Sequence, residues 1–387
     1  MTVFAHAGKR GRTWRFTFDG PRHANGKRNQ ITGAGYRTRR EAEAAEFEAK
    51  RRVRDGEYVS PTKLTLGEFL REHWIPAMSS RVRPSTLESY SRILRVNVEP
   101  HLGSLPIQSV AAGHLDRLYA ELLAGGGRRA TGLSPRSVRY THTVLHGALG
   151  YAVRKQLVTK NVADLADPPS TTQAAPPLKF SCDATQLEVL LTHVQNDRLY
   201  AAWRLFVVTG ARRGEIGGLC WNCVDLDLGE IRIERTLVQV GYEIQWSEPK
   251  TRRGRRTVSL DPETVAILRA HRRRQSEERL AWGKRYHAGD LVFAREDGSP
   301  IHPERWTRML KAHARAAGLP DLHPHTLRDT AATLQTVGGV DIGTVSDRLG
   351  HADPGFTLRT YRQPVKEAEK RAALTMASLM TDASTRA

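Results

Sequence analysis

The chain contains the stretch HTLRDTAATLQTVGGVDIGTVSDRLGHADPGFTLRTY at residues 325–361. It begins with a histidine and an arginine three positions apart, His325 and Arg328. It continues through Leu-Gly-His, which ends at His351, and finishes at Tyr361, ten residues later. Two upstream pieces carry similar side chains, TGARRGE at 209–215 and PKT at 249–251. The side chains of these three pieces indicate chemistry on a phosphate.

Arginine is the side chain that suits phosphate best, because its planar fork of donors matches phosphate oxygens and keeps its charge. Arg212 and Arg328 together could neutralise a phosphate as it gains charge in a transition state. His325 lies three residues before Arg328, so the two share one face of a helix. They can therefore act on one group.

Tyr361 and Lys250 complete the set. A tyrosine hydroxyl, with an ordinary pKa of about 10, is a weak nucleophile until a base or a cation assists it. Lys250 can protonate a departing alkoxide, and it is the only lysine between Lys179 and Lys284. No carboxylate cluster has metal-ligand spacing, so we expect neither a metal nor another cofactor.

The order of these motifs resembles the tyrosine recombinases, the phage integrase group. Five motifs appear in the family's order, and the resemblance covers most of the chain. It implies a set of catalytic residues and one acidic supporting residue: Arg212, Lys250, His325, Arg328, His351 and Tyr361, with Glu215 as the support.

The resemblance also implies the role of each residue. Arg212, Arg328 and His325 hold the scissile phosphate, and Glu215 orients Arg212. Tyr361 attacks and becomes linked to the 3′ phosphate, while Lys250 protonates the leaving 5′ oxygen. His351 supports the phosphate or accepts the tyrosine proton. Because the covalent intermediate retains the bond energy, no ATP is needed.

Two positions depart from the family pattern. Asp329 stands where members often have His, and LCWNC at 219–223 replaces a Leu-x-Trp-x-Asp pattern. Asp329 would change the charge near the site. Cys220 and Cys223 allow a zinc or redox pair, but one pair without a second is a weak signal. We expect both to pack around Trp221, and so few cysteines favour a reducing compartment.

Charge predicts the partner. Lys and Arg exceed Asp and Glu by 60 − 41 = 19, and the isoelectric point is near 10.3, so a polyanion, double-stranded DNA, is expected. A membrane surface would attract the same charge, but no apolar run of about 18 residues and no signal peptide are present. We therefore expect a protein of the bacterial cytoplasm, bound to DNA and not to a membrane.

The chain divides into a multidomain protein, mainly α with small β-sheets. Residues 1–60 predict an arm-type DNA-binding domain with strands at 13–18 and near 30–31, a turn at Asn25-Gly26 and a helix at 39–54. Their basic residues outnumber the acidic ones by 14 to 7 up to residue 62. Residues 64–165 predict four helices, which resemble the family's core-binding domain; the first two are expected to open at the capping boxes Thr65-x-x-Glu68 and Ser85-x-x-Glu88. A proline-rich linker at 166–179 is expected to be extended.

Residues 180–387 predict a mixed α+β catalytic domain. Strands are expected at 230–240, 242–248, 255–260 and 291–293, with Lys250 at the tip of a hairpin formed by the second and third. A helix is expected to open at the capping box Asp183-x-x-Gln186. Another is expected at 199–209, and its stop at Gly210 places Arg212 on a turn. Further helices are expected at 262–281, 303–317, 326–337, 341–349 with a stop at Gly350, and 365–380. The last of these is of the kind that docks on a neighbouring subunit in the family.

These features predict a site-specific recombinase that integrates and excises a phage or integrative element. The resemblance implies a homotetramer on DNA attachment sites, with an excisionase and a host DNA-bending factor as further partners. Two alternatives remain open. One is DNA relaxation of the type IB topoisomerase kind. The other is a catalytically inactive DNA-binding accessory protein, although every matched position carries a competent side chain.

Overall fold

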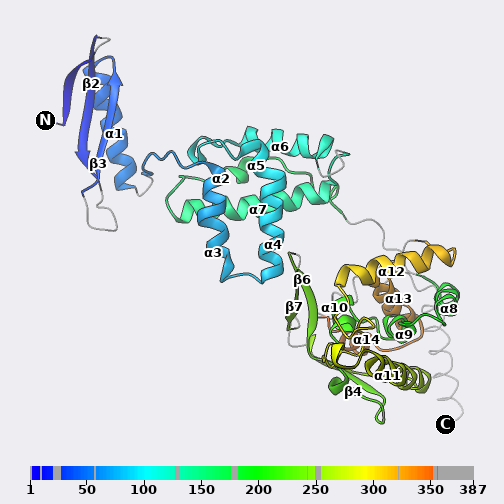
Figure 1. Ribbon diagram of the computed structural model, residues 1–387. Helices are drawn as coiled ribbons and strands as arrows, with labels where there is room; N and C mark the ends of the chain where they lie inside the picture. Colours follow the sequence, from blue (N-terminus) through cyan, green and yellow to red (C-terminus); the bar gives the residue numbers. More distant parts are fainter. Residues whose placement is uncertain are drawn as a thin grey trace, which may run out of the picture. The chain divides into compact units, whose positions relative to one another are not determined.

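The computed structural model describes residues 2–8, 11–20, 28–55, 58–126, 131–175, 182–241, 243–248, 254–320, 322–351 and 355 (Figure 1). The chain forms two compact units, Met1–Pro176 and Pro177–Ala387. The first unit holds two separate hydrophobic cores, one in an N-terminal sheet domain and one in a helical domain. The fold is multidomain and mostly helical with small antiparallel sheets, which confirms the predicted fold class.

The N-terminal sheet domain consists of three antiparallel strands and one helix. The strands β1 (Val3–Gly8), β2 (Gly11–Asp19) and β3 (Gln30–Tyr36) pair in sequence order. Helix α1 (Arg39–Arg54) contacts all three strands and begins at a capping box formed by Thr38 and Glu41 (Figure 1). The sequence predicted β2, β3 and α1 but not β1. The expected Asn25-Gly26 turn lies outside the described residues.

The core of this domain is built on Phe16, of which only 4% is exposed. Its ring packs beside Phe18 and Tyr36, with ring centroids about 6 Å apart in both pairs. A Cβ atom on Gly33 would lie 2.4 Å from the Phe16 ring. Only glycine lets the backbone of β3 approach this closely.

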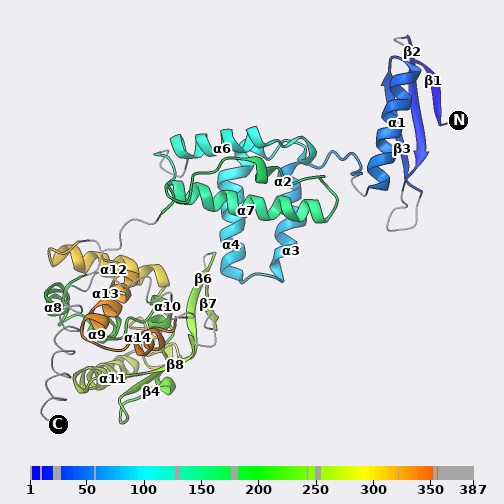
Figure 2. The ribbon, with the colours of Figure 1, turned by 180° about the vertical axis from the view of Figure 1, so that it is seen from behind.

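The helical domain contains the four predicted helices. The first comprises α2 (Leu66–Glu68), the π-helical turn η1 (Phe69–Trp74) and α3 (Ile75–Ser79). The second comprises α4 (Pro84–Ile93), the π-helical turn η2 (Leu94–Val98) and α5 (Glu99–Leu102). After η3 (Ile107–Ser109) come α6 (Ala112–Gly125), α7 (Pro135–Arg154) and η4 (Val162–Leu165). Figure 2 shows α3 and α4 side by side, joined at one end by a short turn.

The capping of these helices differs in one place from the sequence prediction. Thr65 and Glu68 form the expected capping box at the first helix. At the second, Ser-x-x-Glu at 85–88 predicted another, but the helix begins at Pro84 with Arg83 as its N-cap. Proline is favoured at the first helical position because its missing N–H would be unpaired there anyway.

Each π-helical turn stands next to a proline inside a helix. Proline lacks an N–H and its ring collides with the carbonyl four residues earlier. In the turns before Pro76 and Pro100 the backbone bonds five residues back instead, Ile75 N to Leu70 O and Glu99 N to Leu94 O. The helix widens and continues through the proline, so neither helix breaks.

The first part of the predicted linker is packed against the helical domain rather than extended. The Asp167 N–H donates to the Asp116 carboxylate at 2.7 Å. The Arg139 guanidinium donates to the Pro169 carbonyl, also at 2.7 Å. Residues 170–174 form a turn closed by a bond from Ala174 N to Ser170 O. The prolines favour an extended chain, but the hydrogen bonds from this backbone to the Asp116 carboxylate and the Arg139 guanidinium hold it against the domain. Residues 176–179 of the predicted linker lie outside the described part.

The second unit, here called the C-terminal domain, contains helices around a few short strands. The helices are α8 (Ala184–His193), α9 (Tyr200–Thr209), α10 (Arg213–Gly217), η5 (Trp221–Cys223), α11 (Pro262–Trp282), η7 (Gly283–Arg285), α12 (Pro303–Ala316), α13 (Pro324–Val337) and α14 (Ile342–Leu349). The strands are β4 (Val224–Asp225), β5 (Glu230–Ile233), β6 (Thr236–Val240), β7 (Glu243–Ser247) and β8 (Arg256–Ser259). The sheet order is β4-β5-β8, and β6 and β7 form a separate pair.

Three strand predictions for this domain were wrong in detail. The expected strand 230–240 is interrupted between β5 and β6, which belong to different sheets. The strands on either side of Lys250, β7 and β8, pair with β6 and β5 and not with each other. The expected strand 291–293 forms only isolated bridges, from Leu291 to Cys220 and from Ala294 to Pro300. Alternation of apolar residues marks burial, but it does not name the pairing partner.

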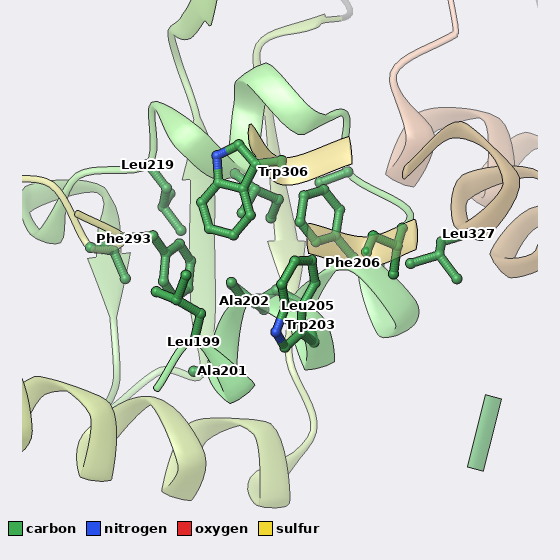
Figure 3. Close-up of a cluster of buried hydrophobic side chains, with 14 of the residues drawn as sticks. Leu199, Ala201, Ala202, Trp203, Leu205, Phe206, Leu219, Phe293, Trp306 and Leu327 are labelled. Carbon is green, nitrogen blue, oxygen red and sulfur yellow. The ribbon is translucent and has the colours of Figure 1, made fainter. Parts of the chain in front are cut away.

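Helix α9 is the centre of this domain and contacts α8, α10, α11 and α13. Its Trp203 meets Trp306 of α12 edge to face, with ring centroids 5.5 Å apart and planes at 80°. Phe206 and Phe293 complete the aromatic cluster (Figure 3). Edge-to-face packing of large buried rings stabilises a fixed helix arrangement. The end of α9 is therefore a rigid platform.

That end is a left-handed turn at Gly210, where φ is 61°. The Thr209 hydroxyl donates to Leu205 O and accepts from Ala211 N. A Cβ on Gly210 would lie 2.7 Å from Leu349 and 3.1 Å from Ala331. The turn thus lies directly against α13 and the end of α14.

We predict that Gly210→Ala destabilises the C-terminal domain by about 1–3 kcal/mol, since it combines left-handed strain with a steric clash. Hydrogen exchange at the amides of α9 and α13 should become about 5- to 150-fold faster, because 1.4 kcal/mol corresponds to a factor of ten. Gly147→Ala is the matched control, because Gly147 lies in α7 with open space at its Cβ. That change should slow exchange in α7. Unchanged exchange in α9 after Gly210→Ala would contradict the packing described.

Candidate active site

Five of the predicted site residues lie in the described part of the chain: Arg212, Glu215, His325, Arg328 and His351. Lys250 and Tyr361 lie outside it. The five come from α10 and its N-cap, from α13, and from the residue after the C-cap of α14. Their side chains and the nearby backbone turns lie together at one place.

Arg328 lies beneath the site with only 2% of its surface exposed. It donates from Nη1 to Gly210 O at 3.0 Å and from Nη2 to Leu349 O at 2.6 Å. Both carbonyls belong to helix C-terminal turns, where backbone oxygens lack a partner within the helix. Arg328 thus joins the ends of α9 and α14 and is itself held in one orientation.

Arg212 is the N-cap of α10, and its side chain is 47% exposed. Its Nη1 donates to Glu215 Oε1 at 2.8 Å, and its backbone N–H donates to Glu215 Oε2 at 2.9 Å. Its Nη2 reaches Gly350 O at 3.4 Å. The guanidinium is therefore directed to the same turn that Arg328 holds. The predicted turn position of Arg212 is where the structure has it.

Glu215 is buried and carries a second guanidinium, that of Arg256. Arg256 Nη2 donates to Glu215 Oε2 at 2.8 Å, and Nη1 donates to Oε1 at 3.2 Å. Burial alone would raise the pKa of Glu215. The hydrogen bond and charge of Arg256, and then the charge of Arg212, instead lower this pKa to about 2. Glu215 is thus an anion at neutral pH.

Arg256 does not stand out in the sequence. It is one of four arginines in the run TRRGRR at 251–256, and nothing in that run distinguishes it from its neighbours. It lies on β8 two residues before the buried Val258 and so shares that residue's face of the strand, but only a tertiary contact between β8 and α10 brings it to Glu215. The roles of the carbonyls of Gly210, Leu349 and Gly350 also escaped sequence reasoning, because backbone acceptors leave no residue signature.

His351 follows the left-handed C-cap Gly350 of α14, and its backbone N–H donates to Ser346 O at 3.1 Å. The residue is 7% exposed. Burial, together with the charges of Arg328 and Arg212, lowers the pKa of His351 to about 4, although Asp329 acts in the opposite direction. The imidazole is therefore neutral at pH 7.

His325 and Asp329 lie on the first turns of α13. The His325 ring is well exposed, and its Nε2 lies 3.8 Å from Oδ2 of the buried Asp329. The residue that departs from the family pattern thus places a carboxylate beside one site histidine and near the other. Its charge reduces the excess of positive charge around His351.

Three family descriptions match this chain. The phage integrase family matches residues 181–368, the phage integrase N-terminal SAM-like domain matches 65–123, and an arm DNA-binding domain matches 5–53. The chain belongs to the phage integrase family.

Known proteins resemble the chain over most of its length. A protein of Caldanaerobacter subterraneus subsp. tengcongensis named "Tyrosine recombinase XerC-like" is 26% identical over 385 residues, which is 95% of this chain and 96% of that protein. Among solved structures, the Tn1549 transposon integrase in complex with transposon right end DNA has a TM-score of 0.66 at 19% identity, over 81% of this chain and 99% of that one. A lambda integrase tetramer bound to a Holliday junction gives 0.56 at 15%, over 93% and 94%. The two structures share the fold.

A groove lies beside the candidate active site, between the two small sheets. It has a volume of about 630 Å³ and is lined by four arginines, two glutamates and Trp246. Arg235 lies over the Trp246 ring, with its guanidinium carbon 5.2 Å from the ring centroid. The groove includes Glu248 and Arg255, which stand on either side of the segment that contains Lys250. A basic groove with an exposed aromatic side chain is the kind of surface that binds nucleic acid.

The cysteine pair is part of ordinary packing. Cys220 and Cys223 are both buried and unbridged. Cys220 Sγ lies 3.7 Å from Gly218 O, and Cys223 Sγ lies 3.6 Å from Glu234 Oε2. Across the described ranges, no three His, Cys, Asp or Glu side chains are grouped to hold a metal ion. Nor does any helix in those ranges have the length and apolar character required to cross a bilayer.

We predict that His351 costs stability in acid. Its pKa is about 4 when folded and near 6.5 when unfolded. Between these two pH values the unfolded state binds a proton that the folded state does not bind. The free energy of unfolding therefore decreases as the pH falls, by about 2–3 kcal/mol at pH 4.5. Glutamine does not bind a proton in this pH range, so His351→Gln removes this effect. In urea unfolding of the C-terminal domain, wild type should therefore lose more stability than the variant between pH 7.5 and pH 4.5. An equal loss in both proteins would contradict the burial of a neutral imidazole.

Proposed function

We propose that this chain is a site-specific tyrosine recombinase that cuts and rejoins double-stranded DNA through a 3′-phosphotyrosine intermediate. Its substrates would be attachment sites, and its task would be to integrate and excise a phage or integrative element. The observation that carries the proposal is the convergence of Arg212, Arg328 and the neutral His351 on one backbone turn, 349–351. Tyr361 follows this turn by ten residues.

The two arginines supply what a phosphoryl transition state needs. Arg328 is oriented by two carbonyls and Arg212 by Glu215, so neither must reorganise when a phosphate binds. Donors fixed in advance stabilise developing charge more strongly than mobile ones. His325, in the first turn of α13, adds a donor at a helix N-terminus, where the backbone favours an anion.

The chemical step is an in-line exchange of ester bonds. The Tyr361 oxygen bonds to phosphorus, and the bond from phosphorus to the 5′ oxygen breaks. Neutral His351 is in the right state to accept the tyrosine proton, and Lys250 gives a proton to the leaving oxygen. A 5′ hydroxyl from another strand then attacks the phosphotyrosine and restores Tyr361. No bond energy is lost, so the cycle needs no external energy source.

Four copies would act together on two attachment sites and exchange strands through a four-way junction. The solved lambda integrase tetramer on a Holliday junction supports this assembly by fold likeness. The family description of residues 5–53 supports a separate arm site on the DNA. An excisionase and a host DNA-bending factor would set the direction of the reaction.

We predict that wild type forms a covalent protein–DNA adduct, trapped in SDS without added metal, on supercoiled DNA that carries the gene's own flanking sequence. Tyr361→Phe should form none, because phenylalanine has no oxygen to attack phosphorus. Tyr286→Phe is the control, since Tyr286 is another tyrosine of the same domain, and it should keep the adduct.

Three other outcomes would support a different nucleophile or a different function. An adduct that persists in Tyr361→Phe would mean that another nucleophile acts. Salt-sensitive binding without an adduct from any variant would favour an accessory DNA-binding protein. Relaxed circles without recombinant product would favour a topoisomerase.

We also predict that removing residues 1–55 separates two kinds of DNA binding. The sheet domain has its own core, so its removal leaves the other domains folded. The shortened protein should still form the adduct on a core site but bind full attachment DNA with a weaker salt dependence, since fewer phosphates are contacted. Gel-shift titrations at several salt concentrations measure this. An unchanged slope would mean that the sheet domain does not contact DNA.

A further inference from the structure

We propose that Arg256 is a positioning residue of the recombination reaction: through the Glu215 carboxylate it sets the guanidinium of Arg212 on the scissile phosphate. The inference rests on the proposed function. It adds to that function a side chain that the family motifs do not single out, on a strand from which the motifs name no residue.

The contact between Arg256 and Glu215 is a buried two-point ion pair. Its distances are 2.8 Å and 3.2 Å, and the two side chains are 6% and 4% exposed. Two parallel bonds fix the rotation of the carboxylate as well as its position. A buried pair of this kind leaves a costly unpaired charge when one partner is removed.

The same two oxygens hold Arg212. Glu215 Oε1 accepts from Arg212 Nη1 as well as from Arg256 Nη1, and Oε2 accepts from the Arg212 backbone N–H as well as from Arg256 Nη2. The carboxylate is thus shared between one buried guanidinium and one half-exposed guanidinium. Because Arg256 occupies the buried side, the exposed guanidinium of Arg212 is the one left to face a substrate.

Arg256 has two further anchors, and both lead to the site. Its Nε donates to Arg348 O, one residue before the Leu349 carbonyl that Arg328 binds. Its Nη1 also donates to Gly254 O at 3.2 Å, the first described residue after the segment 249–253 that contains Lys250. One guanidinium therefore fixes β8, α10 and the end of α14 relative to one another.

Without Arg256, the buried Glu215 carboxylate has one cation left, and that cation is Arg212. We expect Arg212 to be drawn inward to pair with it, away from the phosphate. Lysine would not replace Arg256, since a single ammonium cannot bond to both carboxylate oxygens and to the Arg348 carbonyl in the same planar arrangement.

The test compares two DNA substrates in single-turnover adduct formation. Both carry the attachment site, one with an ordinary scissile phosphate and one with a methylphosphonate there. The methyl group replaces a non-bridging oxygen and removes the negative charge that Arg212 neutralises. A variant that neutralises the phosphate charge poorly should therefore regain much of its rate of adduct formation on methylphosphonate. A variant that is merely less folded should be equally slow on both substrates.

Arg256→Ala is expected to slow adduct formation on the phosphate by about 10²–10³-fold, the usual effect of losing one fixed transition-state donor. On methylphosphonate the defect should shrink at least tenfold, as it should for Arg212→Ala. Arg256→Lys should behave like Arg256→Ala. Arg269→Ala is the matched control, because Arg269 is an exposed arginine of the same domain that pairs with exposed Asp227 and lines neither the site nor the groove, and it should stay near the wild-type rate on both substrates.

The failures are distinguishable. If Arg256→Ala is equally slow on both substrates while wild type reacts, Arg256 only supports the fold and the inference is overturned, but the proposed function stands. Full activity of Arg256→Ala overturns it as well. If wild type forms no adduct on the phosphate, the proposed function fails, and the inference fails with it.

Discussion

The buried guanidinium of Arg328 is the contact on which the site depends. A cation with 2% exposure needs compensation, and two helix-end carbonyls provide part of it. Both carbonyls belong to turns that end in left-handed glycines, Gly210 and Gly350. Helix ends that would otherwise carry unpaired oxygens thus hold the cation, and the cation holds the two helices together. Helix packing, helix capping and the geometry of the candidate site therefore depend on the same few atoms.

The site as a whole carries more positive than negative charge. Three arginines gather near His351, and Glu215 and Asp329 offset them only in part. Burial is the largest cause of the low pKa of His351, and the excess of positive charge lowers this pKa further. A bound phosphate would supply the missing negative charge, so substrate binding should make the imidazole more basic when it has a proton to accept.

Sequence patterns predicted local structure well and long-range pairing poorly. The bounds of α1, the capping boxes at Thr65 and Asp183, and the glycine stops of α9 and α14 follow from interactions within a few residues. The five described motif residues are brought to one place by the fold, and their roles stay predictions. By contrast, the pairing of β8 with β5 and the role of Arg256 depend on residues far apart in sequence. Alternation and propensity do not encode such contacts.

The π-helical turns beside Pro76 and Pro100 have a geometric consequence. In an α-helix, four residues advance about 400°, so side chains spaced by four drift about 40° around the axis at each step. Yet Leu66, Leu70 and Trp74 are all buried, and so are Leu94, Val98 and Leu102. The wider turn slows the rotation, and each series stays on one side of its helix. A proline that looks like an interruption in the sequence thus lets a four-residue repeat run straight along the helical core.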